Sequence, residues 1–252
     1  MLSKRPLAFV DLDDTLFQTA RKMPDGTPRF PATLDQEGRP NGYMSPIQKA
    51  LVEWLFATAD VVPVTARSVE AYKRVQLPFA LGAVCSHGGV ILEPDGSSDA
   101  AWHSLMASAL ARYQTRLADL SETTLTVGSD LGFSLRGWVV EEAGLQNYVV
   151  TKHNGNDDSV LVKVLDVIQA RGLLDGMYVH RNGNNLAFIP VGLEKPIAVQ
   201  EWVRRDRAMN GERLVLGFGD SISDLGFMTD CDFWATPGKS QLARAARSVI
   251  GG

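Results

Sequence analysis

The chain has 252 residues, which is enough to bury a sizeable core and lies between one and two domains of typical size. Its 25 Lys and Arg against 29 Asp and Glu give a net charge of −4, and this argues against a general nucleic-acid-binding protein, since such proteins usually carry a basic face. Two cysteines are too few for a disulfide framework and no apolar run is long enough to span a membrane, so we expect a cytoplasmic protein.

The first 87 residues predict alternating strands and helices. Short apolar runs that read as buried parallel strands lie at 7–12, 61–64 and 81–85. Helices begin after Ser45, where Pro46 and Gln48 complete a capping-box signal, and after Ser68. The order of these elements indicates a doubly wound parallel sheet.

A long polar segment, residues 18–44, separates the first strand from the first helix. It is rich in Pro and Gly and has turn signals at Asp25-Gly26 and Asn41-Gly42. Connections of this length are usually functional or mobile. We therefore expect a flap or hairpin beside the site, with an ordinary surface loop as the alternative.

Residues 88–190 predict a different, α+β pattern. The expected helices are 102–120 and 159–171, and the expected strands are 90–92, 133–141, 148–152, 177–180 and 186–189. The α/β alternation resumes after Pro190, with helices at 195–207, 224–228 and 240–247 and strands at 214–218 and 233–235. The prediction is an α/β core made of 1–87 and 191–252, with 88–190 inserted as a separate domain.

Two aspartates follow the first strand. Asp11 lies at the strand's carboxyl end, where open α/β sheets place their ligands, and an aspartate there can attack phosphorus to form an aspartyl-phosphate. Asp13 points to the same side if the chain stays extended, so it could pass a proton to a leaving alkoxide and take one from water. Two acids inside an apolar run are costly without such a purpose.

Three further segments supply the other groups that phosphoryl transfer needs. Asp220 and Asp224, at a strand end and a helix start, add carboxylates to Asp11, and hard oxygen ligands of this kind favour Mg²⁺. Thr65 ends the second strand and can donate a hydroxyl to a phosphate oxygen, while Lys195 supplies a compact positive charge.

These segments resemble the motifs of the haloacid dehalogenase superfamily. Asp11-x-Asp13-x-Thr15 is similar to its nucleophile motif, and Gly219-Asp220-Ser221-x-x-Asp224 is similar to its fourth motif. Thr65 and Lys195 match the second and third motifs in order, so the likeness covers essentially the whole chain. The insertion resembles the type IIB cap of the Cof-like and sucrose- or trehalose-phosphate phosphatase branch.

The resemblance implies a Rossmann-like core with an α/β cap and Mg²⁺-dependent hydrolysis of a small phosphate monoester, often a phosphosugar. It makes Asp11 nucleophile and metal ligand, and Asp13 acid/base and ligand through its backbone carbonyl. Asp220 would be a direct ligand, and Asp224 a direct or water-mediated one. Thr65 and Lys195 would complete the catalytic set.

The chain also departs from the family pattern. It has Ser86-His87-Gly88-Gly89 where Asn-Gly is common, Ala66 between Thr65 and Arg67 where Gly is common, and Ser223 before the last aspartate where Asn is common. Candidate substrate contacts are Arg67, His87 and Arg181, with ordinary loop or surface positions as the alternative. The partner we expect is a small phosphorylated metabolite, neither nucleic acid nor membrane.

Two other functions stay open at this point. A phosphomutase or phosphotransferase would use the same motifs and pass the phosphoryl group to another hydroxyl, which requires a closed cap that excludes water. A non-catalytic phosphate-binding protein would keep the fold without turnover. The motifs do not name the substrate.

Overall fold

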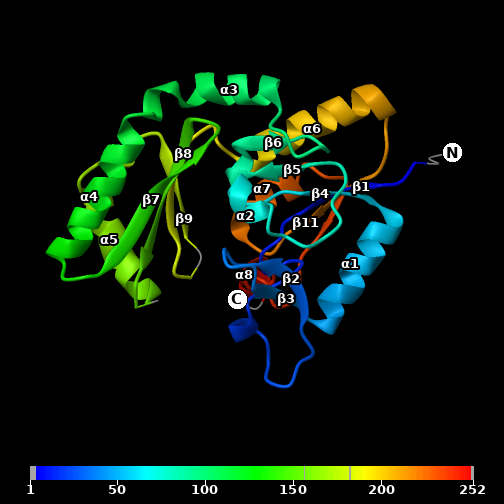
Figure 1. The fold of residues 1–252 in the computed structure, drawn as a ribbon, viewed down its shortest axis with the longest axis horizontal. Helices are drawn as coiled ribbons and strands as arrows, with labels where there is room; N and C mark the ends of the chain where they lie inside the picture. Colours follow the sequence, from blue (N-terminus) through cyan, green and yellow to red (C-terminus); the bar gives the residue numbers. More distant parts are fainter. Residues whose placement is uncertain (1–3, 156, 182, 251–252) are drawn as a thin grey trace. The chain divides into compact units, whose positions relative to one another are not determined.

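The protein divides into two compact units (Figure 1). The computed structural model describes residues 4–155, 157–181 and 183–250. Unit 1 comprises Met1–Asp99 and Glu194–Gly252, and unit 2 comprises Ala100–Leu193. The first boundary differs from the one expected at residue 88, because β5 (Ala83–Cys85) and β6 (Val90–Leu92) pair as an antiparallel hairpin that stays with unit 1.

Unit 1 is built on a parallel sheet with the strand order β12-β11-β1-β4. These strands are Phe233–Ala235, Val215–Phe218, Leu7–Val10 and Asp60–Pro63. A parallel bridge between Val64 and Val84 places β5 next to β4. β1 lies inside the sheet, with β4 from the first part of the chain on one side and β11 from its last part on the other, so the predicted doubly wound parallel sheet is confirmed.

Helices cover both faces of this sheet. Successive side chains of β1 point to opposite faces, and each meets a different helix. Val10 packs in one cluster with Val52 and Leu55 of α1 (Pro46–Thr58). The ring of Phe9, one position earlier, meets Trp202 of α6 (Lys195–Asn210) edge-on at 6.5 Å. Unit 1 also contains α2 (Val69–Tyr72), α7 (Ile222–Met228), α8 (Gln241–Ile250) and the 3₁₀ turns η1 (Ala20–Lys22) and η2 (Ser86–Gly88).

The start of α1 follows the sequence signal. Ser45 accepts a hydrogen bond from the backbone N–H of Gln48 at 3.3 Å, and the Gln48 side chain accepts one from the Ser45 N–H at 3.0 Å. The predicted capping box is therefore confirmed, and it satisfies two N–H groups that a helix start leaves without partners.

The 18–44 segment contains an antiparallel hairpin made of β2 (Phe30–Leu34) and β3 (Pro40–Met44). The hairpin is attached to the rest of unit 1 by backbone hydrogen bonds from Leu34 N to Arg74 O (3.0 Å) and from Gln76 N to Ala32 O (2.8 Å). The hairpin is thus an integral part of the unit, and the alternative of an ordinary surface loop is excluded for 30–44.

Unit 2 is an antiparallel sheet of order β7-β8-β10-β9 with helices packed on it. Its strands are Leu135–Glu142, Leu145–His153, Leu186–Pro190 and Met177–Arg181, and its helices are α3 (Ala100–Leu110), η3 (Ala111–Tyr113), α4 (Arg116–Asp130) and α5 (Asp158–Ala170). The prediction of a single helix at 102–120 is wrong. The α-helix is interrupted between Leu110 and Arg116. In this interval the buried Tyr113 hydroxyl donates to Gly176 O at 2.7 Å, and the Gln114 side chain forms hydrogen bonds with the backbone of β8.

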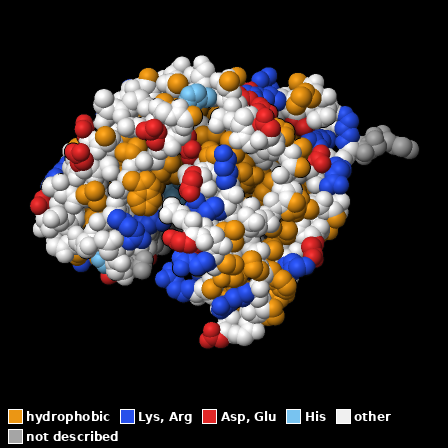
Figure 2. All heavy atoms as spheres, in the orientation of Figure 1, with side chains coloured by type: hydrophobic (Ala, Val, Ile, Leu, Met, Phe, Trp, Pro, Cys, Tyr) orange, Lys and Arg blue, Asp and Glu red, His pale blue; other side chains and the backbone are white. Residues whose placement is uncertain are grey.

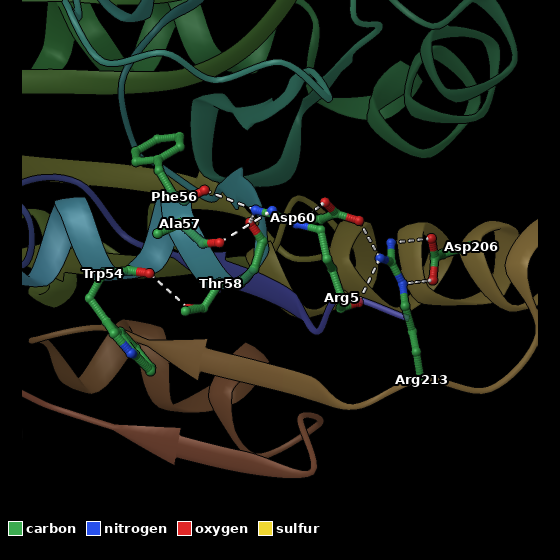
Figure 3. A network of polar contacts seen from close by, with 9 residues as sticks. Arg5, Trp54, Phe56, Ala57, Thr58, Asp60, Asp206 and Arg213 are labelled. Atoms are coloured by element: carbon green, nitrogen blue, oxygen red, sulfur yellow. Dashed lines mark hydrogen bonds and ion pairs between the residues drawn. The ribbon is translucent and has the colours of Figure 1, made fainter. Parts of the chain in front are cut away.

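At the amino ends of β1, β4 and β11 a network of ion pairs ties the strands together (Figure 3). Arg213, just before β11, makes a bidentate pair with Asp206 of α6 and also contacts Asp60 at the start of β4. Arg5, just before β1, pairs with Asp60 and donates to carbonyls of the last turn of α1. The Arg213 and Asp206 side chains are only 7% and 8% exposed.

The surface carries charged side chains of both signs (Figure 2). On the face drawn in Figure 2, basic and acidic side chains are interspersed, in keeping with the small net charge. A search of the described helices for one with the length and apolarity needed to cross a membrane finds none.

Candidate active site

The carboxyl ends of three neighbouring strands bring the predicted residues together. Val10, the last residue of β1, pairs in register with Pro63 of β4 on one side and Phe218 of β11 on the other. Asp11 is the first residue after β1, and Thr65 and Asp220 are each the second residue after their strands, so all three lie at the same edge of the sheet. This edge is where open α/β sheets bind their ligands.

Lys195 connects two of the acids. It is the first residue of α6, and its Nζ lies 2.7 Å from Asp11 Oδ1 and 2.6 Å from Asp224 Oδ1. All three side chains are less than a tenth exposed. Burial opposes the charge on the lysine, but the two carboxylates outweigh it and raise the pKa of Lys195 above its usual value. The ammonium group is thus held charged between the acids.

Asp224 has two functions in the local structure. Its Oδ2 accepts hydrogen bonds from the backbone N–H groups of Asp220 (3.2 Å) and Ser221 (3.0 Å) and from the Ser221 hydroxyl (2.7 Å), which completes a capping box at the start of α7. Its other oxygen faces Lys195. Burial alone would raise the pKa of Asp224, but Lys195 and Ser221 outweigh burial and lower it, so the carboxylate stays ionised.

Asp11, Asp220 and Asp224 form a group of buried carboxylates whose oxygens lie within 4.8 Å of one another. Burial and the charge of Asp224 raise the pKa of Asp11 well above its ordinary value, against the effect of Lys195. Burial, then the charges of Asp224 and Asp14, raise the pKa of Asp220 to about 7. No ion pair among the described residues includes Asp220.

This group fits a divalent cation. Two of its three carboxyls are held away from their preferred ionised state by burial and mutual repulsion, and one lysine does not balance three acids. A small cation with oxygen ligands would supply the missing charge, and carboxylates are the ligands Mg²⁺ takes in such sites. Asp13 is not in the group of side chains, and a contribution from its backbone carbonyl stays a prediction.

Asp13 is paired with Arg67 instead. The Arg67 guanidinium donates from Nε to Asp13 Oδ2 at 2.7 Å and from Nη2 to Asp13 Oδ1 at 2.8 Å. The Asp13 side chain is 52% exposed. Arg67 was expected at the substrate, but in this structure its bidentate partner is a residue of the nucleophile motif.

Thr65 and His87 lie on adjoining backbone segments. Thr65 is buried, and its Oγ1 accepts a hydrogen bond from Arg67 N at 3.1 Å, which leaves its hydroxyl hydrogen for a phosphate oxygen. The turn at Ser86–His87 donates from its two N–H groups to Arg67 O (2.7 Å) and Thr65 O (3.1 Å). Both turn residues have φ above 50°, a strained conformation of the kind that clusters at functional sites.

Gly88 ends this turn against the helix that carries Lys195. A Cβ atom on Gly88 would lie 2.4 Å from the carbonyl oxygen of Glu194, and φ is +103°, so only glycine fits. The loop after β5 is therefore packed between the Thr65 loop and the start of α6. His87 itself is buried, and Arg181 is an exposed residue of β9 in unit 2.

Other residues of the site were not assigned a role from the sequence. The Thr15 hydroxyl donates to Asp11 Oδ2 at 3.4 Å, and Ser221 holds Asp224 as described above. Thr15 and Ser221 both lie inside the motifs described above, so their place in the sequence could have indicated a role in the site. Lys22 of η1 pairs with Asp14, and Thr33 of β2 contacts Arg67. Nothing in the sequence pointed to Thr33.

Several solved structures have a fold similar to that of this chain. The chain is similar to the C-terminal domain of C. albicans trehalose-6-phosphate phosphatase (13% identity over 89% of this chain and 73% of that one, TM-score 0.58). It is similar to the sucrose-phosphatase of Synechocystis, solved with sucrose and phosphate (15% identity, 98% of each chain, TM-score 0.52). It also resembles a haloacid dehalogenase-like hydrolase from Bacteroides thetaiotaomicron (12% identity, 98% of this chain and 100% of that one, TM-score 0.50).

No family model and no curated protein matches the chain in sequence. The structural likeness, at identities of 12 to 15% in these three cases, is a likeness of fold. The chain has the haloacid dehalogenase-like fold over essentially its whole length, as the sequence motifs predicted.

Proposed function

We propose that the protein is a phosphatase that hydrolyses a small phosphate monoester, in particular a phosphosugar, through an aspartyl-phosphate intermediate. The observation that carries the proposal is the buried group of Asp11, Asp220 and Asp224 around Lys195, at the carboxyl edge of a parallel sheet. Enzymes named for trehalose-6-phosphate and sucrose-phosphate hydrolysis share this fold, which supports a sugar phosphate as the substrate class.

In the first step Asp11 attacks phosphorus, and the bond between phosphorus and the ester oxygen breaks. Asp13 gives a proton to that oxygen, so the alcohol leaves neutral. Thr65 binds a phosphate oxygen through its hydroxyl hydrogen, and Lys195 holds Asp11 in position with its 2.7 Å contact. In the second step water attacks phosphorus, Asp13 takes its proton, and the bond from phosphorus to Asp11 breaks to release phosphate.

Mg²⁺ is the cofactor of this proposal. Asp11, Asp220 and Asp224 would hold it by side-chain oxygens, with Asp13 as a further ligand through its backbone carbonyl. When bound, the ion would neutralise phosphate oxygens and favour the ionised form of Asp11. Lys195 then serves mainly to fix Asp11 and Asp224 relative to each other.

Unit 2 is proposed to be the cap that selects the substrate, with Arg181 as a candidate contact, and His87 as a candidate contact on unit 1. The fold does not choose among sugars, because fold and specificity are separate properties. The proposed compartment is the cytoplasm.

The test is phosphate release by the purified protein with Mg²⁺, measured on p-nitrophenyl phosphate and on a panel of sugar phosphates. We expect release without any added acceptor, and a higher kcat/KM for at least one sugar phosphate than for the aryl ester. Lack of turnover on the whole panel would argue for the phosphate-binding alternative. Release that depends on a second hydroxyl compound would argue for the phosphotransferase.

A further inference from the structure

The guanidinium group of Arg67 is fixed between the site and the inserted hairpin. On one side it makes the bidentate pair with Asp13 at 2.7 and 2.8 Å. On the other side its Nη1 donates to Thr33 Oγ1 at 3.3 Å and to Ala71 O at 3.4 Å. The guanidinium carbon Cζ lies over the ring of Phe17, 5.1 Å from the ring centroid. These contacts leave the planar group little freedom to rotate.

Thr33 is held as firmly as Arg67. It is 1% exposed, and it forms an antiparallel bridge with Val75 in the segment after α2. The residue opposite it in the hairpin is Gly42, where a Cβ atom would come within 2.2 Å of the Thr33 methyl carbon. Because Gly42 has no side chain, the Thr33 methyl group fits against it, and the Thr33 hydroxyl is directed at Arg67.

Asp13 needs such support. Its side chain is 52% exposed and follows the end of β1 by three residues, so the fold alone does not fix its carboxylate. A group that transfers a proton must lie within hydrogen-bond reach of the reacting oxygen, and an error of about 1 Å can cost on the order of 10²-fold in rate. Asp13 follows the proposed nucleophile Asp11 by two residues, so the pair with Arg67 lies on the same short segment as the nucleophile.

We propose that Arg67 and Thr33 are positioning residues that hold the carboxylate of Asp13 in one orientation beside Asp11. This inference rests on the proposed phosphatase function and deepens it. It gives the hairpin of the 18–44 segment a task in the site, because Thr33 reaches Asp13 through Arg67. It also removes Arg67 from the substrate contacts and makes it act through the acid.

A positioning role of Arg67 and Thr33 differs from a purely structural one in its effect on two kinds of ester. An alkoxide is a poor leaving group and needs the proton from Asp13, whereas p-nitrophenolate leaves readily without it. Misplacing Asp13 must therefore slow an alkyl ester more than an aryl ester. The ratio of kcat for glucose 6-phosphate to kcat for p-nitrophenyl phosphate measures the position of the acid independently of how much protein is folded.

The experiment compares Thr33→Val with Thr33→Ser. Valine keeps the shape of the side chain and removes the oxygen that Arg67 contacts, while serine keeps the oxygen. For Thr33→Val we expect the ester ratio to fall roughly 10-fold, with KM for the aryl ester changed less than about two-fold. Thr33→Ser should restore the ratio. Arg67→Met should lower it further, by roughly 10²-fold, and Arg67→Lys should recover only part, since lysine lacks the bidentate fork.

Arg39→Met is the matched control on the same hairpin. Arg39 is 71% exposed and pairs with Asp35 and Glu37 away from Asp13, so the ester ratio should stay at the wild-type value. If Thr33→Val leaves both esters unchanged, or slows both in the same proportion, the positioning role is refuted while the phosphatase stands. If the wild-type protein hydrolyses neither of these two esters nor any other sugar phosphate of the panel, the proposed function itself fails.

Discussion

The carboxylate of Asp220 should make the metal-free protein less stable, and its replacement by asparagine should stabilise it. Asp220 is 8% exposed and lies beside the ionised Asp224, and no ion pair among the described residues includes it. A buried carboxylate without a positively charged partner destabilises the folded state until a cation binds to it. Asp220→Asn keeps the size of the side chain and removes its charge.

The magnitude follows from the pKa of Asp220, which burial and neighbouring charges raise from 3.8 to about 7. Each pKa unit corresponds to about 1.4 kcal/mol, so the ionised side chain costs the folded state up to about 4 kcal/mol. The folded state binds the proton more tightly than the unfolded state does. The stability of the wild type should therefore fall as the pH rises from about 4 to about 7, and the full cost should apply above that range.

The assay is urea unfolding in EDTA at several pH values. Near pH 8 we expect Asp220→Asn to be more stable than the wild type by a few kcal/mol, and near pH 4 the two should be alike. Adding Mg²⁺ should stabilise the wild type, by about 2.7 kcal/mol at 100 times Kd, and the variant much less. Asp25→Asn, on an exposed turn, is the control and should stay within about 0.5 kcal/mol of the wild type. An Asp220→Asn protein that is less stable than the wild type near pH 8 in EDTA would refute the reasoning.

Three other expectations can be checked. Asp11→Asn should reduce phosphate release by at least about 10³-fold with an unchanged circular dichroism spectrum, because the amide cannot attack phosphorus; near-wild-type turnover would contradict the assignment. EDTA should abolish activity and excess Mg²⁺ should restore it. Asp206→Asn should cost roughly 3 kcal/mol of unfolding free energy, since it leaves the buried Arg213 without its bidentate partner. Burial opposes the charge on Asp206, but Arg213 and Asn210 outweigh it and lower its pKa, so this difference should shrink as the pH falls below about 4.

The sequence predicted the parallel sheet and the site at its edge because both depend on short-range patterns. Buried strands of three to five residues read as apolar runs, and the residue after each run lies at the strand's carboxyl end whatever the rest of the chain does. Register between β1, β4 and β11 then brings Asp11, Thr65 and Asp220 to one place. The signal for Lys195 was weaker, because a lysine at a helix start is usually solvated.

Features that depend on tertiary contacts could not be predicted. The contact between Thr33 and Arg67 spans 34 positions and exists only because β2 docks on the segment after α2. The helix expected at 102–120 is interrupted because Tyr113 and Gln114 bond to distant backbone groups. Unit 2 begins at Ala100, whereas residue 88 was expected, because β6 pairs with β5 and so stays with unit 1. None of these interactions leaves a periodic pattern in the sequence.

Asp224 lies where the start of α7 meets the proposed metal site. As the third residue of α7 it closes a capping box with Ser221, which any helix start could use. A cap, however, requires only one carboxylate oxygen and an exposed position suits it. Here the side chain is 1% exposed, and its second oxygen meets the ammonium of Lys195, which in turn holds Asp11. The capping bonds therefore fix the orientation of Asp224, and this orientation directs its remaining oxygen into the group of acids. The helix start and the proposed metal site are stabilised by the same carboxylate, so a substitution there should affect both.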